Sequence, residues 1–517
     1  MIRSLAGLAG ALGLLICGAA AAAPLVATPD GRLRGSAKDG VETFLGAPYA
    51  APPVGALRWA PPSAATPWAG VRDATQPGHR CPQTATGPIP RSDDEDCLTL
   101  NVFRPAAPSA KPRAVLVYAH GGGATNGAGA DHDGSALASQ GDIVVVTVNY
   151  RLGALGFMTH PAIAAQAADG QAGNYGVMDV EAALRWVARN IRAFGGDPAK
   201  VTIAGESAGG TVICPLLAAP SAKGLFRAAI LSSDDCLHDV DTWQQARARA
   251  QALSQRLDCR EPADVAACLR GRTPRQIVDA GGFAAPHIGG PGGPDAYTFD
   301  RIARGDWTPV PVMIGSTREE GRIAGPGFLS FDAAAYATWL RRLVPDAMAV
   351  RIAATYPAEA PGKPTAYAIS AVLTDSGMRG YGGCANLALA RAMARQAPVW
   401  LYQFEDPAPP FDRRADGFDF AAAHSSELTS LWPGGAFAER TARLTPAQRD
   451  LSRQMIAFWA AFVRDGDPGA AWPRLGDDYM ALRPDGSKAR AASAFEADHH
   501  CALWTSAPWI MDRGEAR

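Results

Sequence analysis

The sequence predicts a doubly wound α/β fold, in which helices cover a mostly parallel central sheet. Residues 114–119 and 143–148 are continuous apolar runs, which suit strands covered on both faces of a parallel sheet. A helical pattern over residues 180–194 then leads into a strand-like segment at 201–204. Strands and helices therefore alternate along the chain, which is typical of a layered α/β domain.

The segment before these parallel strands predicts short antiparallel strands. Residues 25–48 alternate apolar and polar side chains around two turn signals, Pro29-Asp30-Gly31 and Lys38-Asp39-Gly40. The proline-rich stretch 105–112 predicts a loop or an extended connection.

The helix at 180–194 has recognisable ends. Asp179 is its expected N-cap, and Gly195-Gly196 is its expected stop. Beyond the strand at 201–204 we expect a helix that runs through Leu217 and a further strand at 228–231.

Two later apolar segments, 310–314 and 399–404, predict additional strands. Between them, residues about 325–395 are rich in Ala, Leu and Arg and mostly helical in pattern. We interpret this stretch as a helical cap insertion within one domain that spans residues 24–517, and not as a separate domain.

Charge and composition narrow the classes of function. The chain has 49 Lys and Arg against 50 Asp and Glu, a formal net charge of -1, and 47% hydrophobic residues, enough for a large core. It has no basic run and no mixture of basic and aromatic residues of the kind that nucleic-acid binding needs. We therefore expect no nucleic-acid partner.

The N-terminus predicts export. Residues 1–23 combine Arg3, an apolar stretch at 5–17 and a small-residue tract before Pro24, which is the pattern of a secretory signal peptide. The short Leu/Ile core argues against a retained membrane anchor. We expect a secreted or periplasmic protein. Cys17 would leave with the signal, and the other eight of the nine cysteines would then lie where disulfides persist.

The central motif of the chain is Gly205-Glu206-Ser207-Ala208-Gly209, at the end of the strand at 201–204. A Gly-x-Ser-x-Gly sequence between a strand and a helix holds its serine on a tight, strained turn with the hydroxyl exposed. The two glycines have no Cβ, so strand and helix can approach closely. Ser207 is the candidate nucleophile.

A serine nucleophile needs a base, and the base needs a carboxylate that orients it. In chain order the acid comes before the histidine, each at the carboxyl end of a strand. Glu319 and Glu320 both follow the strand at 310–314 and compete for the acid role.

The candidate base is His424, which follows the strand at 399–404. Only His499 and His500 lie further along the chain, side by side near the C-terminus, where we expect a surface or disulfide-flanking role. His424 is therefore chosen by elimination.

The negative oxygen of a tetrahedral intermediate needs preorganised hydrogen-bond donors. His120-Gly121-Gly122-Gly123 directly follows the strand at 114–119. The backbone N–H groups of Gly122, Gly123 and Ala208 are the candidate oxyanion donors. This chemistry needs no metal ion and no organic cofactor.

Several blocks of the sequence resemble the type-B carboxylesterases, a family that includes bacterial carboxylesterases, some fungal lipases and the cholinesterases. The resemblance runs from about Gly31 to the C-terminus and is densest in the first half. The blocks that carry it are FLGAPYAAPPVG (44–55), EDCLTLNV (95–102), NYRLG (149–153), GNYG (173–176) and FGGDP (194–198).

The resemblance implies the α/β-hydrolase fold and an ester hydrolase. It implies Glu320 as the triad acid, rather than Glu319, because Gly321 follows it. The other implied roles are Ser207 as acyl-enzyme nucleophile, His424 as base, and Gly122, Gly123 and Ala208 as oxyanion donors.

The resemblance also suggests three disulfides: Cys81 to Cys97, Cys259 to Cys268, and Cys384 to Cys501. Cys214 and Cys236 are left over, and their pairing with each other stays open.

The sequence departs from the family in places that bear on the substrate. Ala124 stands where relatives usually carry an aromatic residue, which would widen that side of the pocket. The segment 81–97 lacks the tryptophan that cholinesterases use for a quaternary ammonium, which argues against choline esters. Residues 232–236 and 286–294 also depart from the family pattern.

We therefore expect a serine carboxylic-ester hydrolase whose substrate is a small to medium-sized, or bulky, ester. The alternatives are a lipase, a specialised natural-product esterase, and a non-catalytic binding protein on the same fold. The presence of all three triad residue types argues against the last. The identity of the ester and the oligomeric state stay open.

Overall fold

The computed structural model describes residues 23–505, apart from residues 88, 168–169, 238–239, 261–264, 283–284, 292, 360–361, 379–381, 413–414, 416 and 477. The predicted signal peptide lies outside the described residues, except for Ala23. Within the described ranges, none of the helices combines the length and the apolar character that crossing a bilayer requires.

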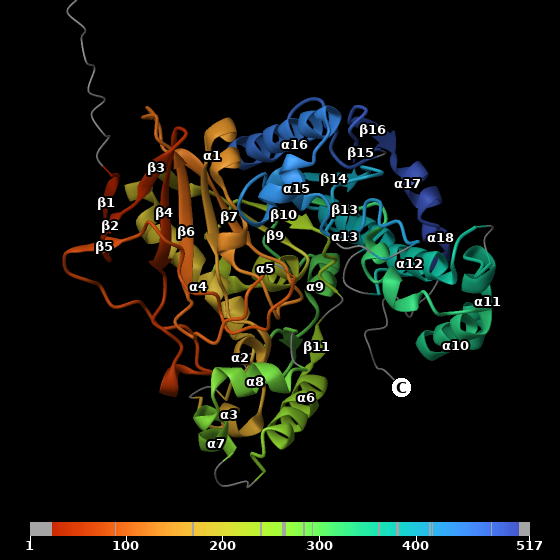
Figure 1. Ribbon diagram of the computed structural model, residues 1–517, viewed down its shortest axis with the longest axis horizontal. Helices are drawn as coiled ribbons and strands as arrows, with labels where there is room; N and C mark the ends of the chain where they lie inside the picture. Colours follow the sequence, from red (N-terminus) through yellow and green to blue (C-terminus); the bar gives the residue numbers. More distant parts are fainter. Residues whose placement is uncertain are drawn as a thin grey trace, which may run out of the picture.

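The main sheet has eleven strands in the spatial order β16-β15-β14-β13-β10-β9-β7-β8-β6-β4-β3 (Figure 1). Their bounds are β3 (Ser36–Lys38), β4 (Val41–Pro48), β6 (Thr99–Pro105), β7 (Arg113–Ala119), β8 (Val144–Val148), β9 (Gly196–Glu206), β10 (Ala228–Ser232), β13 (Val312–Thr317), β14 (Val399–Phe404), β15 (Asp478–Leu482) and β16 (Lys488–Ala491). The strands from β15 through β8 pair in parallel, and the pairs at both edges are antiparallel.

Two small sheets lie outside this main sheet. One contains β1 (Leu25–Thr28), β2 (Gly31–Arg34) and β5 (Val71–Asp73), and the other pairs β11 (Asp241–Thr242) with β12 (His287–Ile288). The predicted mostly parallel sheet with antiparallel N-terminal strands is therefore confirmed.

The α-helices are α1 (Ser135–Gly141), α2 (Gly153–Phe157), α3 (Pro161–Ala164), α4 (Tyr175–Asn190), α5 (Ala208–Ala218), α6 (Trp243–Arg256), α7 (Val265–Gly271), α8 (Pro274–Ala280), α9 (Thr298–Arg304), α10 (Ala333–Leu343), α11 (Asp346–Thr355), α12 (Thr365–Ser376), α13 (Gly383–Ala394), α14 (Leu428–Leu431), α15 (Ala438–Ala442), α16 (Pro446–Asp465), α17 (Ala492–Asp498) and α18 (Cys501–Thr505). The short 3-10 helices are η1 (Gly55–Leu57), η2 (Gly129–Asp131), η3 (Ile191–Phe194), η4 (Pro220–Ala222), η5 (Glu320–Ile323), η6 (Gly325–Phe328) and η7 (Gly435–Phe437).

The sheet separates two apolar layers. Successive side chains of a strand point to opposite faces, and β7 shows this clearly. Val115 and Val117 belong to the core layer that contains α4 and α5, whereas Leu116 and Tyr118 belong to the layer that contains α1 and α16. Because both faces of β7 are covered, its sequence is a continuous apolar run.

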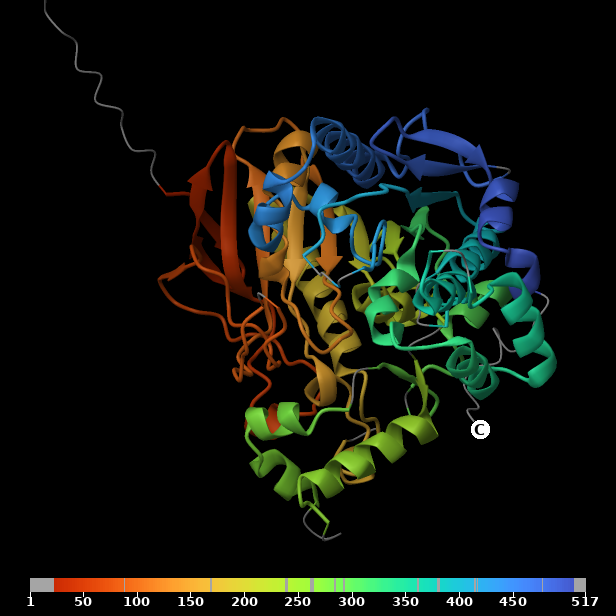
Figure 2. The same cartoon turned by 45° about the vertical axis from the view of Figure 1, so that its right-hand side comes forward.

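The helical insertions lie at the ends of the sheet. In both ribbon views α6, α7 and α8 gather with α3 below the sheet, and α10 and α11 project at the right-hand side, away from the N-terminal strands (Figure 1 and Figure 2). The helices α10, α11, α12 and α13 fall within the stretch at about 325–395 for which the sequence predicted a helical excursion.

The prediction that Asp179 caps the helix before the nucleophile strand is wrong. The helix α4 begins earlier, at Tyr175, and its N-cap residue is Asn174, with φ +55°. Asp179 instead lies inside the helix, fully buried, and pairs with Arg151 at 2.7 Å. A buried carboxylate needs a charged partner, and Arg151 supplies one.

Four disulfides occur among the described residues, with sequence separations from 9 to 117 positions. The structure pairs Cys81 with Cys97, Cys259 with Cys268, and Cys384 with Cys501, as the resemblance suggested. It also pairs Cys214 with Cys236, which the sequence had left open. This fourth bond ties α5 to the loop after β10.

Candidate active site

Ser207 lies on a tight turn between β9 and α5. Its backbone has φ +55° and ψ -129°, a strained combination for a residue with a Cβ. A Cβ on Gly205 would lie 2.3 Å from the Gly209 carbonyl oxygen, and one on Gly209 would lie 2.1 Å from the Ala119 carbonyl oxygen. The two glycines are therefore required for the close packing of strand and helix, as the motif predicted.

His424 lies between Ser207 and Glu320. Its Nε2 is 2.8 Å from Ser207 Oγ, and its Nδ1 is 2.5 Å from Glu320 Oε2. The serine follows β9, the glutamate follows β13, and the histidine follows β14, so the carboxyl ends of three parallel strands deliver the three side chains to one edge of the sheet. The structure thus brings together the three residues that the sequence selected.

The structure distinguishes Glu320 from its neighbour Glu319. Glu320 is fully buried, and its Oε1 accepts hydrogen bonds from Ser233 Oγ at 2.6 Å and from the Thr317 N–H at 2.7 Å. Glu319 instead accepts from the Ala422 N–H at 3.2 Å. Only Glu320 of this pair is hydrogen-bonded to His424.

The other C-terminal histidines have separate partners. His499 Nδ1 lies 2.6 Å from Asp375 Oδ1, and its ring also contacts Gln403. His500 packs edge-on against the Tyr356 ring. Neither is hydrogen-bonded to Ser207 or Glu320 by any contact in the described part of the chain.

The glycine loop after β7 lies against the nucleophile. A Cβ on Gly121 would lie 3.2 Å from Ser207 Cβ. Gly122 and Gly123 have φ +103° and +61°, values that glycine adopts without strain. Ala208, the third candidate donor, is the first residue of α5, where backbone N–H groups lack partners within the helix.

Neighbouring carboxylates determine whether the neutral or the protonated form of His424 is favoured. Burial alone lowers the pKa of His424, but the Glu320 carboxylate, together with Glu206 and Glu427, outweighs burial and raises it to about 9. The nearest of the two additional acids is Glu206, whose Oε1 lies 3.6 Å from His424 Nε2. The site therefore favours the imidazolium that forms when the histidine takes a proton.

The two additional acids differ in their partners. Glu206 accepts a hydrogen bond from Ser425 Oγ, whereas neither carboxylate oxygen of the buried Glu427 has a hydrogen-bond partner among the described residues. Burial raises the pKa of both groups, and that of Glu427 is raised well above its usual value. An unpaired carboxylate is costly to bury, so the protonated form is favoured more strongly at Glu427 than at Glu206.

Sequence reasoning missed Ser233 and Glu427. Ser233 follows β10, which lies between β9 and β13, and its φ of +52° directs the hydroxyl to Glu320. Its place directly after a core strand was the available signal. Glu427, three residues after the predicted base, gave no signal because a lone acid beside a histidine is usually exposed.

One group of potential metal ligands occurs among the described residues, namely Cys214, Asp234 and Cys236. Both sulfur atoms are joined in a disulfide, so neither is a thiolate that could bind a metal ion. Asp234 serves this loop in another way, because it accepts hydrogen bonds from Thr211 Oγ1 at 2.6 Å and from the Cys236 N–H at 2.9 Å.

A serine on a strand-to-helix turn, a histidine and a buried glutamate in one hydrogen-bonded chain define the class of serine hydrolases on an α/β sheet. A model of the carboxylesterase family matches residues 22–504. The chain belongs to this family, and it is a carboxylic-ester hydrolase with the α/β-hydrolase fold.

Individual relatives support the same conclusion. The chain is 34% identical over 470 residues to fumonisin B1 esterase of Sphingopyxis macrogoltabida, which covers 87% of this chain and 84% of the relative. It is 33% identical over 485 residues to para-nitrobenzyl esterase of Bacillus subtilis (strain 168), which covers 87% and 92%. A crystal structure of a Geobacillus stearothermophilus carboxylesterase is 30% identical, covers 93% of this chain and 99% of that one, and superposes with a TM-score of 0.79.

Proposed function

We propose that the chain hydrolyses esters through an acyl-enzyme on Ser207. The observation that carries this proposal is the continuous hydrogen-bonded chain from Ser207 Oγ through the His424 ring to Glu320. A serine hydroxyl becomes a competent nucleophile when a base accepts its proton during attack. The His424 Nδ1–H donates to Glu320, so in the neutral ring the lone pair lies on Nε2, which accepts the serine proton.

The first half of the reaction forms the acyl-enzyme. His424 Nε2 takes the Ser207 proton as Oγ bonds to the ester carbonyl carbon, and the carbonyl oxygen becomes negative. The backbone N–H groups of Gly122, Gly123 and Ala208 stabilise that oxygen. The intermediate then collapses, the bond to the alcohol oxygen breaks, and the His424 imidazolium gives its proton to the departing alcohol.

The second half restores the enzyme. A water molecule attacks the acyl carbon while His424 Nε2 accepts one of its protons. The bond to Ser207 Oγ then breaks, the acid leaves, and the histidine returns its proton to the serine oxygen. No step needs a redox reagent.

We propose that the site accepts bulky as well as small esters. The names of two relatives refer to a para-nitrobenzyl ester and to fumonisin B1, both larger than simple alkyl esters. The buried Ala124 follows the proposed oxyanion donors directly, and its methyl group fills less space beside the scissile ester than an aromatic ring would. A lipase is the second candidate function. The length of the acyl chain in the preferred substrate separates a lipase from an esterase of this kind.

An ester panel tests this function. It contains p-nitrophenyl acetate, butyrate and palmitate, p-nitrobenzyl acetate, and fumonisin B1, each assayed with the wild type and with Ser207→Ala. We expect hydrolysis of short-chain and benzyl esters, and a loss of kcat of about a thousandfold or more in the variant. A preference for emulsified palmitate would instead assign a lipase, and unchanged rates in Ser207→Ala would contradict the mechanism.

We propose that the protein is secreted or periplasmic. The predicted signal peptide and the four disulfides support this location, because disulfides persist in oxidising compartments. N-terminal sequencing of the protein recovered outside the cytoplasm should find a chain that begins near Pro24. A cytoplasmic protein that still begins at Met1 would contradict the location.

A further inference from the structure

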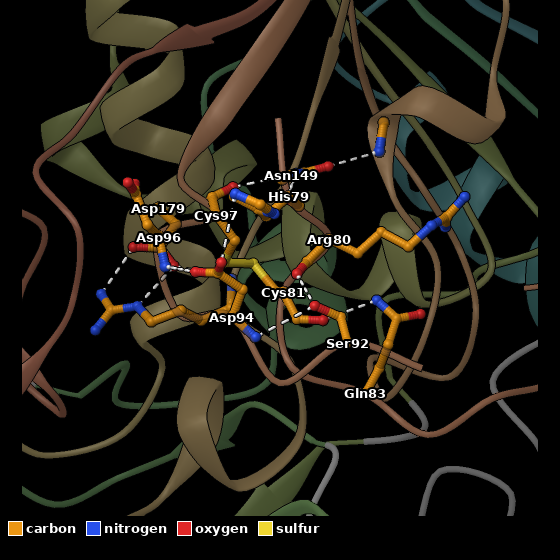
Figure 3. The surroundings of a disulfide bond; sticks show 12 residues. His79, Arg80, Cys81, Gln83, Ser92, Asp94, Asp96, Cys97, Asn149 and Asp179 are labelled. Carbon is orange, nitrogen blue, oxygen red and sulfur yellow. Dashed lines mark hydrogen bonds and ion pairs between the residues drawn. A yellow bond between two sulfur atoms is a disulfide. The ribbon is translucent and has the colours of Figure 1, made fainter. Parts of the chain in front are cut away.

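Figure 3 shows the surroundings of the Cys81–Cys97 disulfide, which closes the segment 81–97. Hydrogen bonds between Gln83 and Gly127 join this segment to the loop that carries the proposed oxyanion donors. Gln83 makes the most direct connection between them. Its side chain is completely buried, with an exposed fraction of 0%. A buried amide is retained only where its donor and acceptor are satisfied, so its contacts identify what it holds.

Gln83 binds both backbone groups of Gly127. The Gly127 N–H donates to Gln83 Oε1 at 2.9 Å, and Gln83 Nε2 donates to the Gly127 carbonyl oxygen at 2.9 Å. Nε2 also donates to the Cys81 carbonyl oxygen at 2.9 Å. The amide thus pairs with Gly127 as a neighbouring strand would, and it fixes the orientation of that peptide as well as its position.

Gly127 in turn closes the glycine loop. It has φ +104°, and a Cβ there would lie 2.6 Å from His120 Nδ1, so the end of the loop packs on its beginning. Between these ends, the N–H groups of Thr125 and Asn126 both donate to the Gly122 carbonyl oxygen. A Cβ on Gly122 would lie 2.2 Å from the Asn126 carbonyl oxygen, so the chain beside Gly127 also determines the position of Gly122.

The backbone of Gln83 is itself fixed. Gln83 and Ser92 exchange two backbone hydrogen bonds, at 2.9 and 3.1 Å, inside the disulfide-closed segment. Asn149 adds a second connection, because its Oδ1 accepts from the Gly129 N–H at 2.8 Å and its Nδ2 donates to the Cys97 carbonyl oxygen at 3.1 Å. The disulfide-closed segment therefore provides a rigid support for the glycine loop.

We propose that Gln83 is a positioning residue for the oxyanion-binding loop, and that it acts through Gly127 on the N–H groups of Gly122 and Gly123. This inference rests on the proposed function of those N–H groups. The negative oxygen exists only in the transition state and the intermediate, so a displaced loop lowers kcat while substrate binding changes little. An unfolded fraction would also lower the apparent kcat, but it would leave the affinity of the active molecules for a transition-state analogue unchanged.

The first test compares Gln83→Met, which keeps the length of the side chain and removes both hydrogen bonds to Gly127, with Arg91→Ala. Arg91 ties the same disulfide-closed segment to Asp279 in α8 and has no hydrogen bond to the glycine loop, so it is the matched control. We expect kcat of Gln83→Met to fall about tenfold to a hundredfold, with KM within about twofold of the wild type. We expect Arg91→Ala to keep wild-type kcat.

A trifluoromethyl ketone inhibitor supplies the specific readout. It forms a hemiketal with the serine whose oxygen occupies the oxyanion position, so its inhibition constant should rise in Gln83→Met by the same factor as kcat falls. A kcat within twofold of the wild type, or a lowered kcat with unchanged inhibition, would overturn the proposal. Esterase activity that survives Ser207→Ala would instead overturn the proposed function on which the inference rests.

Gln83→Glu decides the question if Gln83→Met does not fold. A protonated carboxyl offers one donor and one acceptor, enough for both bonds to Gly127 although not for the amide's second donation, to the Cys81 oxygen. The carbonyl oxygens of Cys81 and Gly127 favour that protonated form. The ratio of its kcat to the wild-type kcat should therefore be near one at about pH 6 and fall at least about threefold by about pH 9, where the carboxylate ionises and repels the Gly127 oxygen. A ratio that is constant with pH would overturn the proposal.

Discussion

At the scale of single residues, His424 has three buried acids near it, Glu206, Glu320 and Glu427, which differ in their hydrogen-bond partners. Glu320 and Glu206 accept hydrogen bonds, which stabilise a negative charge near the imidazole ring, whereas the buried Glu427 has no hydrogen-bond partner among the residues described. The raised pKa of His424, about 9, places the loss of its proton on the alkaline side of an ordinary histidine. Ester hydrolysis should therefore increase toward alkaline pH, because the base must be neutral to accept the serine proton.

Glu206→Gln tests this arrangement. Removing a negative charge 3.6 Å from His424 Nε2 disfavours the imidazolium, so the pKa of His424 falls. The acid limb of the pH profile of kcat/KM should then move to lower pH. Glu427→Gln is the matched control and should shift the limb less, because burial without a hydrogen-bond donor disfavours the charged form of Glu427. An unmoved limb in Glu206→Gln would show that Glu206 does not set the charge of the base.

Most of the proposed catalytic residues could be selected from sequence because each follows a recognisable core strand. Ser207 has a local motif, and chain order with elimination among the later histidines pointed to His424. Chain order left Glu319 and Glu320 as competing acids, and only the resemblance to the carboxylesterases favoured Glu320. Ser233 and Gln83 could not be predicted in the same way. Their roles depend on contacts with Glu320 and Gly127, which lie 87 and 44 positions away, and only the folded chain brings these residues together.

At the scale of secondary-structure elements, the turn between β9 and α5 determines where the nucleophile stands. The sequence located this turn because its requirement is local: two residues without a Cβ flank the serine. The start of α4 was misplaced because Asp179 was expected to cap the helix. Asp179 instead pairs with Arg151, 28 positions earlier in the chain. The pairing of β6 with β4 and β8 was also beyond prediction, since it depends on antiparallel neighbours distant in sequence.

Gly209→Ala tests the turn. The added Cβ would lie 2.1 Å from the Ala119 carbonyl oxygen, a backbone atom that can move only if β7 moves. We expect a loss of about 1–3 kcal/mol in unfolding free energy together with a lower kcat, because Ala119 immediately precedes the glycine loop. Gly271→Ala is the control, since a Cβ there meets no heavy atom within 4 Å. Wild-type stability in Gly209→Ala, measured by chemical denaturation, would contradict the account.

At the scale of the whole molecule, the disulfides connect elements that the sheet alone does not hold together. Cys384–Cys501 joins α13 to the C-terminal helix α18 across 117 positions, whereas Cys259–Cys268 closes a separation of only 9. The fold class was predictable because the parallel core strands contain continuous runs of apolar residues. The pairing of Cys214 with Cys236 was not, since it depends on how α5 packs against the loop after β10.

The two disulfides should differ in their contribution to stability. A cross-link that closes a longer loop lowers the conformational entropy of the unfolded chain more. From the loop lengths, the stabilisation of the folded state is about 5 kcal/mol for Cys384–Cys501 and about 3 kcal/mol for Cys259–Cys268. We therefore expect the double variant Cys384→Ser with Cys501→Ser to have the lower Tm of the two serine pairs. Equal losses of Tm in the two double variants would contradict this ranking.

The most direct measurement traps the acyl-enzyme and locates it by mass spectrometry. The protein is mixed with a slowly deacylating p-nitrophenyl ester, quenched in acid and digested. The account predicts a single acyl group on the peptide that contains Ser207, and no such adduct in Ser207→Ala. Ester hydrolysis with an acyl group on another residue, or undiminished hydrolysis in Ser207→Ala, would contradict it.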